Sequence, residues 1–134
     1  MPPGAPQPAD PARFTVLLVD DAEDCLATLD IALQTLPGVV VRSARCAEDA
    51  QTMLLNGSVG ALVTDIHLPA MTGLELISWI RRKPDLRGLP VIVVSADADP
   101  AAPRRALERG ANAFFAKPFS PAAVRKRLEE LIHA

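Results

Sequence analysis

The 134-residue sequence lacks several features that mark common classes of protein. Acidic and basic residues nearly balance, with a formal net charge of −2, so the composition gives no electrostatic argument for binding nucleic acid or an anionic membrane. No apolar run approaches the ~20 residues needed to cross a bilayer. Residues 1–12 lack the basic start and apolar stretch of a secretory signal. We therefore expect a cytoplasmic protein that contacts neither membrane nor nucleic acid directly.

Cysteine is also scarce. Cys25 and Cys46 are too few and too widely spaced to form a metal knuckle. Both lie in segments expected to be helical, and free cysteine is commonly buried. We expect two reduced side chains in or near the core.

Residues 1–13 contain five prolines among small residues. Proline lacks a backbone donor, so this stretch is predicted to be a flexible, proline-rich leader. The remainder, residues 14–134, has no internal repeat and fits one domain in length.

Short apolar runs alternate with helical patterns from Phe14 onward. The runs lie at residues 14–19, 39–41, 61–64, 90–94 and 113–115. Strands that are apolar on both sides are buried on both faces, which predicts a parallel sheet covered by helices.

Five helices are expected between and after these strands. The third begins with a capping box from Thr72 to Glu75, and the fifth begins with Ser120 as N-cap followed by Pro121. The other three are expected to end at Pro37, to run from Ala47 to near Gly57, and to span about residues 101–109. The residues expected to face inward are Leu26, Leu29, Leu33, Leu36, Leu74, Ile77, Ile80, Val124, Leu128 and Leu131.

This alternation predicts an α/β fold of the doubly wound (βα)5 type. Right-handed crossovers leave few topologies. We expect a flavodoxin-like three-layer sandwich with a five-stranded parallel sheet in the order 2-1-3-4-5. Function in such sheets lies at the carboxyl edge of the strands.

Polar residues follow four of the predicted strands at that edge: Asp20 and Asp21, Asp65, Ser95, and Lys117. Any one of them has an ordinary explanation, because a strand-terminal Asp often caps a helix and a Ser there is often a turn residue. Together they indicate one cleft. Three carboxylates repel one another unless a cation is present, and magnesium prefers such oxygen ligands. Lys117 suits a phosphoryl oxygen, and a carboxylate can act as a nucleophile toward phosphorus.

Four segments resemble the receiver domain of bacterial two-component response regulators. They are Val-Leu-Leu-Val-Asp-Asp (16–21), Val-Thr-Asp-Ile-His-Leu-Pro-Ala-Met-Thr-Gly (63–73), Val-Ile-Val-Val-Ser-Ala (91–96) and Phe-Phe-Ala-Lys-Pro-Phe (114–119). The resemblance extends from Phe14 to the C-terminus.

The resemblance implies a role for each matched residue. Asp65 would be the phosphoacceptor, and Asp20, Asp21, Asp65 and the backbone carbonyl of His67 would hold Mg²⁺ or Mn²⁺. Lys117 would contact the phosphoryl group, with a cis bond to Pro118, while Ser95 and Phe114 would form the switch. Pro69 and Gly73 would shape the loop after Asp65. His67 and Asp97 occupy positions that tune the phosphorylated lifetime in this family.

The resemblance also implies a signalling function. A histidine kinase or a histidine phosphotransfer protein would supply the phosphoryl group, and the face formed by the fourth helix, fifth strand and fifth helix would bind a downstream protein or a second copy of the chain. The domain would be no enzyme beyond its own phosphorylation and dephosphorylation. We expect a stand-alone receiver, with a fragment of a larger regulator or hybrid kinase as the alternative.

Two rival classes fit less well. A haloacid-dehalogenase-like phosphatase needs an Asp-x-Asp pair at its first strand, whereas Asp20 and Asp21 are adjacent. A flavodoxin-like cofactor binder needs a phosphate loop rich in Gly, Ser or Thr there, but residues 21–24 are acidic.

Overall fold

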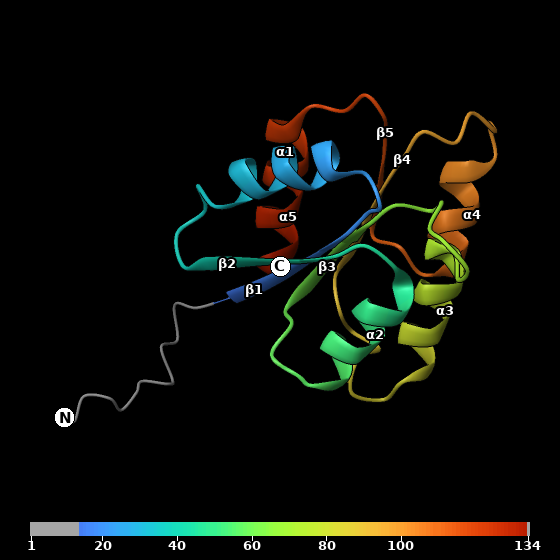
Figure 1. Ribbon diagram of the computed structural model, residues 1–134, viewed down its shortest axis with the longest axis horizontal. Helices are drawn as coiled ribbons and strands as arrows, with labels where there is room; N and C mark the ends of the chain where they lie inside the picture. Colours follow the sequence, from blue (N-terminus) through green and yellow to red (C-terminus); the bar gives the residue numbers. More distant parts are fainter. Residues whose placement is uncertain (1–13, 134) are drawn as a thin grey trace.

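The computed structural model describes residues 14–133, so the predicted leader at 1–13 lies outside the described residues. One parallel sheet runs through it in the order β2-β1-β3-β4-β5, as predicted. Figure 1 shows the sheet crossing the molecule between helices. The strands are β1 (Phe14–Val19), β2 (Val39–Ala44), β3 (Ala61–Thr64), β4 (Val91–Ser95) and β5 (Ala113–Ala116).

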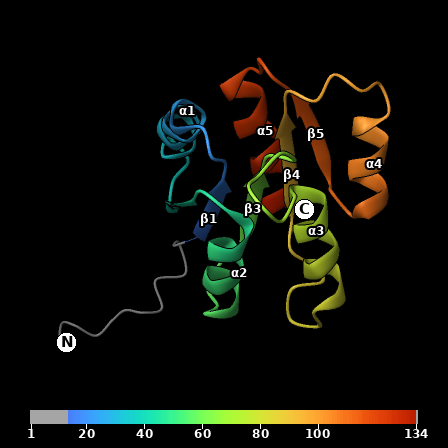
Figure 2. The ribbon, with the colours of Figure 1, turned by 45° about the vertical axis from the view of Figure 1, so that its right-hand side comes forward.

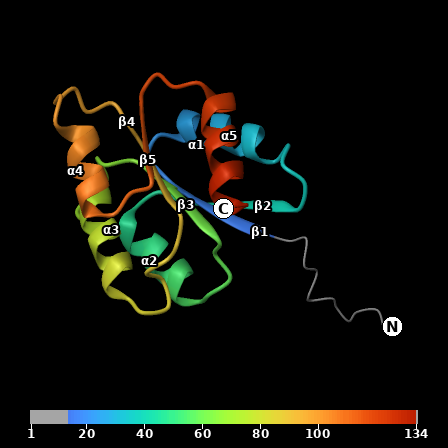
Figure 3. The ribbon, with the colours of Figure 1, turned by 180° about the vertical axis from the view of Figure 1, so that it is seen from behind.

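The helices form a layer on each face of the sheet. In Figures 1 and 3, α1 and α5 lie together on one face, and α2, α3 and α4 lie on the other. The three-layer flavodoxin-like prediction is therefore confirmed. The helices are α1 (Glu23–Leu33), α2 (Ala47–Leu55), α3 (Gly73–Arg82), α4 (Ala102–Arg109) and α5 (Pro121–Ile132). Within residues 14–133, no helix is both long and apolar enough to cross a membrane.

Alternate residues of each strand supply the two halves of the core. Val16 and Leu18 of β1 pack toward α1 and α5, while Leu17 and Val19 pack toward α2, α3 and α4. This follows from the period of two along a strand. It explains why the central strands are almost entirely apolar, and why edge strand β2 carries exposed Arg42.

The helix ends match the predicted capping chemistry. The Thr72 hydroxyl accepts a hydrogen bond from Glu75 N (3.1 Å), and the Glu75 carboxylate accepts one from Thr72 N (2.9 Å). Ser120 Oγ accepts from Ala123 N (3.1 Å), with Pro121 as the first helical residue. Both signals are local, which is why sequence alone located them.

Four local expectations need correction. Helix α1 ends at Leu33 and not at Pro37, because residues 34–38 form turns. In α3, Leu76 is fully buried while Leu74 is half-buried, because the helix presents a wider stripe to the sheet than the sequence pattern indicated. Cys46 is the residue before α2 and lies outside it. Strand β2 extends to Ala44, since it pairs with β1 along its whole length.

Arg81, at the end of α3, ties that helix to the loops before β4 and β5. Its guanidinium donates to the carbonyls of Gly110 (2.6 Å), Leu89 (2.7 Å) and Arg87 (2.8 Å), and to Asn112 Oδ1 (3.2 Å). Gly110 ends α4 in the left-handed conformation, with φ at 118°, which suits glycine. The Arg81 guanidinium thus provides hydrogen bonds to acceptors in both the loop before β4 and the loop before β5.

Replacing Arg81 should therefore cost stability. We expect Arg81→Met to lower the free energy of unfolding by about 2 kcal/mol, because partly buried carbonyls lose a charged donor. Arg82→Met, at the exposed next position, should stay within about 0.5 kcal/mol of wild type. Urea denaturation measures both, and equal effects would contradict a tying role for Arg81.

Candidate functional site

Three carboxylates meet at the carboxyl edge of the sheet. Asp20 and Asp21 follow β1, and Asp65 follows the adjacent strand β3, where Asp65 N bonds to Val19 O (3.0 Å). One oxygen from each carboxylate lies within 4.8 Å of the others. Asp20 and Asp65 are only 2% and 6% exposed, whereas Asp21 is exposed. The sequence prediction that these groups converge is confirmed.

Lys117, just past β5, brings the positive charge. Its ammonium lies 2.8 Å from Asp20 Oδ2 and 3.2 Å from Asp65 Oδ2. Burial alone would lower the pKa of Lys117, but the Asp20 hydrogen bond and the charges of Asp65 and Asp20 raise it to about 12. The side chain therefore stays protonated at neutral pH.

The charge in this cluster is not balanced by Lys117. Three carboxylates against one ammonium leave two negative charges among the residues that meet there. Hard divalent cations take such carboxylate oxygens, and magnesium usually binds through one or two of them. The donor set of Asp20, Asp21 and Asp65 therefore fits a divalent metal in both chemistry and charge.

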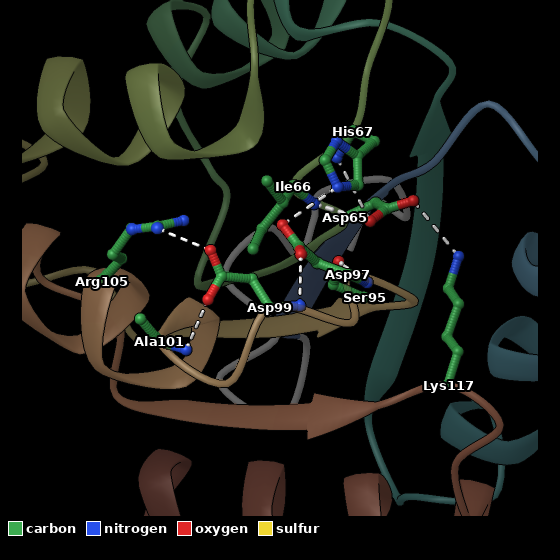
Figure 4. Close-up of polar contacts among 9 residues, drawn as sticks. All are labelled: Asp65, Ile66, His67, Ser95, Asp97, Asp99, Ala101, Arg105 and Lys117. Atoms are coloured by element: carbon green, nitrogen blue, oxygen red, sulfur yellow. Dashed lines mark hydrogen bonds and ion pairs between the residues drawn. The ribbon is translucent and has the colours of Figure 1, made fainter.

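The two oxygens of Asp65 have different surroundings. Oδ1 accepts hydrogen bonds from Ile66 N (2.7 Å) and His67 N (3.3 Å), while Oδ2 faces the ammonium of Lys117. Figure 4 shows the Asp65 side chain between the His67 loop and Lys117. The amides fix the carboxylate rotamer and leave Oδ2 directed toward the charged cleft.

The loop after Asp65 is held by a close backbone contact. Gly73 N donates to Ile66 O (2.7 Å), and a Cβ at Gly73 would lie 1.9 Å from the carbonyl oxygen of Asp65. Ala70 in this loop has a φ of 64°, a conformation costly for residues with a side chain. The sequence pointed to Pro69 and Gly73 here but not to Ala70.

Ser95 ends β4 at the same edge and is completely buried. Its hydroxyl accepts a hydrogen bond from Asp97 N (3.1 Å). Asp97 Oδ2 in turn lies 3.2 Å from Nε2 of His67, so a side-chain pair joins the loops that follow β3 and β4 (Figure 4). Both residues were singled out from the sequence. Their contact could not be predicted, because 30 positions separate them in the chain and no local pattern indicates the pairing.

Further hydrogen bonds connect Asp97 to the start of α4. Asp97 Oδ1 accepts from Asp99 N (2.9 Å), Asp99 Oδ1 accepts from Ala101 N (2.9 Å), and Asp99 Oδ2 pairs with Arg105 (2.6 Å), as Figure 4 shows. The Ala101 amide and the Arg105 cation lower the pKa of Asp99. We call Ser95, Asp97, Asp99 and Arg105 the loop relay. Asp99 and Arg105 belong to no sequence motif, so neither was predicted as a site residue.

Phe114 and Pro118 complete the predicted set. Phe114 pairs in register with Val93 of β4 and packs, half-buried, against the cluster that includes Ala102 and Ala106 of α4. The Lys117–Pro118 peptide bond is cis, as the resemblance implied.

Cys25 of α1 also reaches this region, which the sequence did not indicate. Burial, followed by a hydrogen bond to Asp20 and the charge of Asp20, raises the pKa of the thiol to about 12. The thiol is therefore neutral at physiological pH, and both Cys25 and Cys46 are free and half-buried.

A methyl group at position 73 should disturb Asp65 directly. Gly73→Ala must displace the Asp65 carbonyl, so we expect a loss of about 1–3 kcal/mol in unfolding free energy and shifted amide resonances at Asp65 and Ile66. Gly88→Ala is the matched control, because a Cβ there has nothing within 4 Å. Unshifted Asp65 and Ile66 resonances in a folded Gly73→Ala protein would refute the close contact.

Most of this chain is similar in sequence and structure to known proteins. Residues 16–129 match the model of the response regulator receiver domain. A chemotaxis protein CheY homologue of Campylobacter jejuni is 30% identical over 118 residues, covering 87% of this chain and 91% of that protein. The transcriptional regulatory protein GltR of Pseudomonas aeruginosa is 32% identical over 118 residues, covering 88% of this chain and 48% of GltR. A response regulator of Chloroflexus aurantiacus superposes with a TM-score of 0.85 at 30% identity, covering 91% of this chain and 99% of that structure.

Proposed function

Since the chain belongs to the response regulator receiver family, we propose that Asp65 accepts a phosphoryl group from the phosphohistidine of a histidine kinase or histidine phosphotransfer protein. One observation carries the proposal: Asp65 lies beside Asp20 and Asp21, and the Lys117 ammonium contacts both Asp65 and Asp20. Receiver domains generally bind a divalent metal, and we propose Mg²⁺ or Mn²⁺ held by Asp20, Asp21, Asp65 and the His67 carbonyl.

In the proposed transfer, Asp65 Oδ2 attacks phosphorus. A P–O bond forms while the P–N bond of the phosphohistidine breaks, and its electron pair returns to the imidazole nitrogen. The transition state is loose and highly charged, so the protein mainly positions the reacting groups and neutralises the charge on the phosphoryl oxygens. A divalent cation, when held by Asp20, Asp21 and Asp65, would supply positive charge near the phosphoryl oxygens. Lys117 supplies another, and its pKa of about 12 keeps that charge present at neutral pH. The domain would turn over no other substrate.

Mass spectrometry tests the acceptor. Incubation with a small phosphodonor such as acetyl phosphate and Mg²⁺ should add one phosphate to the wild-type chain, and a chelator should abolish the gain. Asp65→Asn should gain nothing. Asp24→Asn, an exposed carboxylate change nearby, should gain phosphate as wild type does. Phosphate on Asp65→Asn, or none on wild type, would overturn the assignment.

We further propose that phosphorylation acts on α4 through the loop relay. A phosphoryl group adds charge of ~−1.5 to −2 and acceptor oxygens, and the Ser95 hydroxyl turns to donate to one of them. Turning Ser95 Oγ removes the acceptor of Asp97 N, so the hydrogen bond from Asp99 N to Asp97 and the Asp99–Arg105 ion pair rearrange with it. Phe114 then moves into the space near Ser95. The α4–β5–α5 face changes shape as a result, and this face would bind the downstream protein or form a homodimer.

Substitution of two neighbouring arginines of α4 tests the loop relay. Arg105→Ala removes the ion pair with Asp99, so the amides of Asp99, Ala101 and Ala102 should exchange with solvent about threefold faster in the unphosphorylated protein. The further change on phosphorylation should be smaller than in wild type. Arg104→Ala removes only a 4.0 Å contact with Glu108 and should leave exchange at these amides unchanged. Hydrogen exchange with mass spectrometry measures both, and identical behaviour of the two variants would contradict the relay.

The relatives differ in how much of their length the matched domain occupies. The matched domain makes up 91% of the chemotaxis relative but 48% of GltR, so likeness alone favours neither the stand-alone receiver nor a receiver within a larger protein. The stand-alone receiver stays a prediction. The cytoplasmic location stays a prediction.

A further inference from the structure

A shallow groove runs along the outer side of α3, beginning at the end of the loop that follows Asp65. Its volume is about 430 Å³, and its lining residues are Met71, Glu75, Ser78, Trp79, Arg82 and Arg109. Positions 75, 78, 79 and 82 are three or four apart, so they share one face of α3. Arg109 comes from the last turn of α4, which lies beside α3 in Figures 1 and 2. Only Arg109 comes from α4 and none of the six residues belongs to β5 or α5, so the groove lies mainly on α3 and meets the α4–β5–α5 face at Arg109 at most.

The groove is positively charged within a chain of net charge −2. Among residues 14–133, no carboxylate pairs with Arg82 or Arg109; the recorded ion pairs of arginine involve only Arg45, Arg104, Arg105 and Arg127. Glu75, the one acid in the groove, already accepts the Thr72 amide in the capping box. Two guanidinium groups therefore face one occupied carboxylate.

The arginines are also placed to bind a ligand. Arg109 Nη1 donates to Ser78 Oγ (3.1 Å), which extends the guanidinium from α4 across to α3 and leaves its other N–H groups available. Arg82 is exposed and its planar group presents several donors in a fork that matches a carboxylate.

Trp79 gives the groove an apolar floor. It is half-buried, packs on the core cluster beneath, and has the Lys83 ammonium 5.1 Å from its ring centroid. Tryptophan, arginine and methionine are enriched at protein interfaces, and Trp and Arg dominate the residues that carry binding energy there. Four of the six lining residues are of these three types.

We propose that this α3–α4 groove binds an acidic peptide segment of a partner protein. An apolar or aromatic side chain of the segment rests on Trp79 and Met71, and flanking carboxylates pair with Arg82 and Arg109. A nucleic acid is the less suitable anion, since it needs a longer basic surface than two arginines provide. Binding here does not require Asp65 to be phosphorylated.

A random peptide library displayed on phage, selected against the unphosphorylated chain, supplies the probe. Selected peptides should be rich in Asp and Glu beside an aromatic or aliphatic residue. Trp79 is the only tryptophan and the chain has no tyrosine, so its fluorescence reports occupancy of the groove directly. A synthetic selected peptide without Trp or Tyr should change that fluorescence saturably, and added salt should weaken binding.

Charge-reversing substitutions test whether Arg82 and Arg109 bind the peptide. Arg82→Glu, Arg109→Glu and the double variant should weaken peptide binding, with about a tenfold loss for the double variant. Arg42→Glu makes the same charge change on β2 and should bind as wild type does. Arg82 makes no hydrogen bond recorded within residues 14–133, so its single variant remains informative if Arg109→Glu loses stability.

Three results would overturn the proposal. They are selected peptides without acidic enrichment, peptides that bind the double variant as tightly as wild type, and an oligo-dT strand that alters Trp79 fluorescence at lower concentration than the peptides. Phosphate uptake from acetyl phosphate should persist in the double variant, which separates this inference from the function proposed for Asp65.

Discussion

Repulsion among three carboxylates is the constraint on which the functional end of this protein depends. The parallel sheet places Asp20 and Asp65 on adjacent strand ends, where both are shielded from water. Lys117 arrives from β5 and offsets part of the charge through contacts of 2.8 and 3.2 Å. The remaining negative charge favours a divalent cation. The proposed phosphoryl group would add further charge, which Lys117 and a divalent cation would offset. The contacts of Lys117 with Asp20 and Asp65 thus stabilise the close carboxylates of the fold and support the phosphorylation proposed for Asp65.

The second constraint is the connection between this charged cleft and α4. Helix α4 has only two fully buried side chains, Ala102 and Ala106, and both are small. Its position therefore relies more on polar contacts than that of α3, which buries Leu76, Ile77 and Ile80. The N-terminal contacts lead through Asp99 and Asp97 to the Ser95 hydroxyl. A local change in charge at Asp65 can thus bias a helix that little apolar surface holds in place.

Sequence predicted the parts of this structure that depend on local rules. The strand order, the capping box at Thr72 and the convergence of Asp20, Asp65 and Lys117 followed from apolar runs, cap residues and the geometry of parallel sheets. The His67–Asp97 contact, the Asp99–Arg105 pair and the Arg81 hydrogen bonds did not follow. They join side chains whose distance depends on how loops pack, and no periodicity records that packing. Ala70 is similar, because nothing in the residue itself indicates a left-handed backbone.

The two ends of α4 differ in what holds them, and this difference gives the proposed switch a direction. The carbonyl of Gly110, after the last turn, accepts hydrogen bonds from the partly buried guanidinium of Arg81, and Arg109 bonds to Ser78 of α3. Neither contact involves a residue of the Asp65 cleft. The first turn is tied through Arg105 and Asp99 to Ser95, which does border that cleft. If phosphorylation rearranges only the Ser95 end, α4 must pivot about its C-terminal end. Such a pivot changes the α4–β5–α5 face most, while it leaves the Arg109 side of the α3–α4 groove nearly fixed, so the two surfaces can serve different partners.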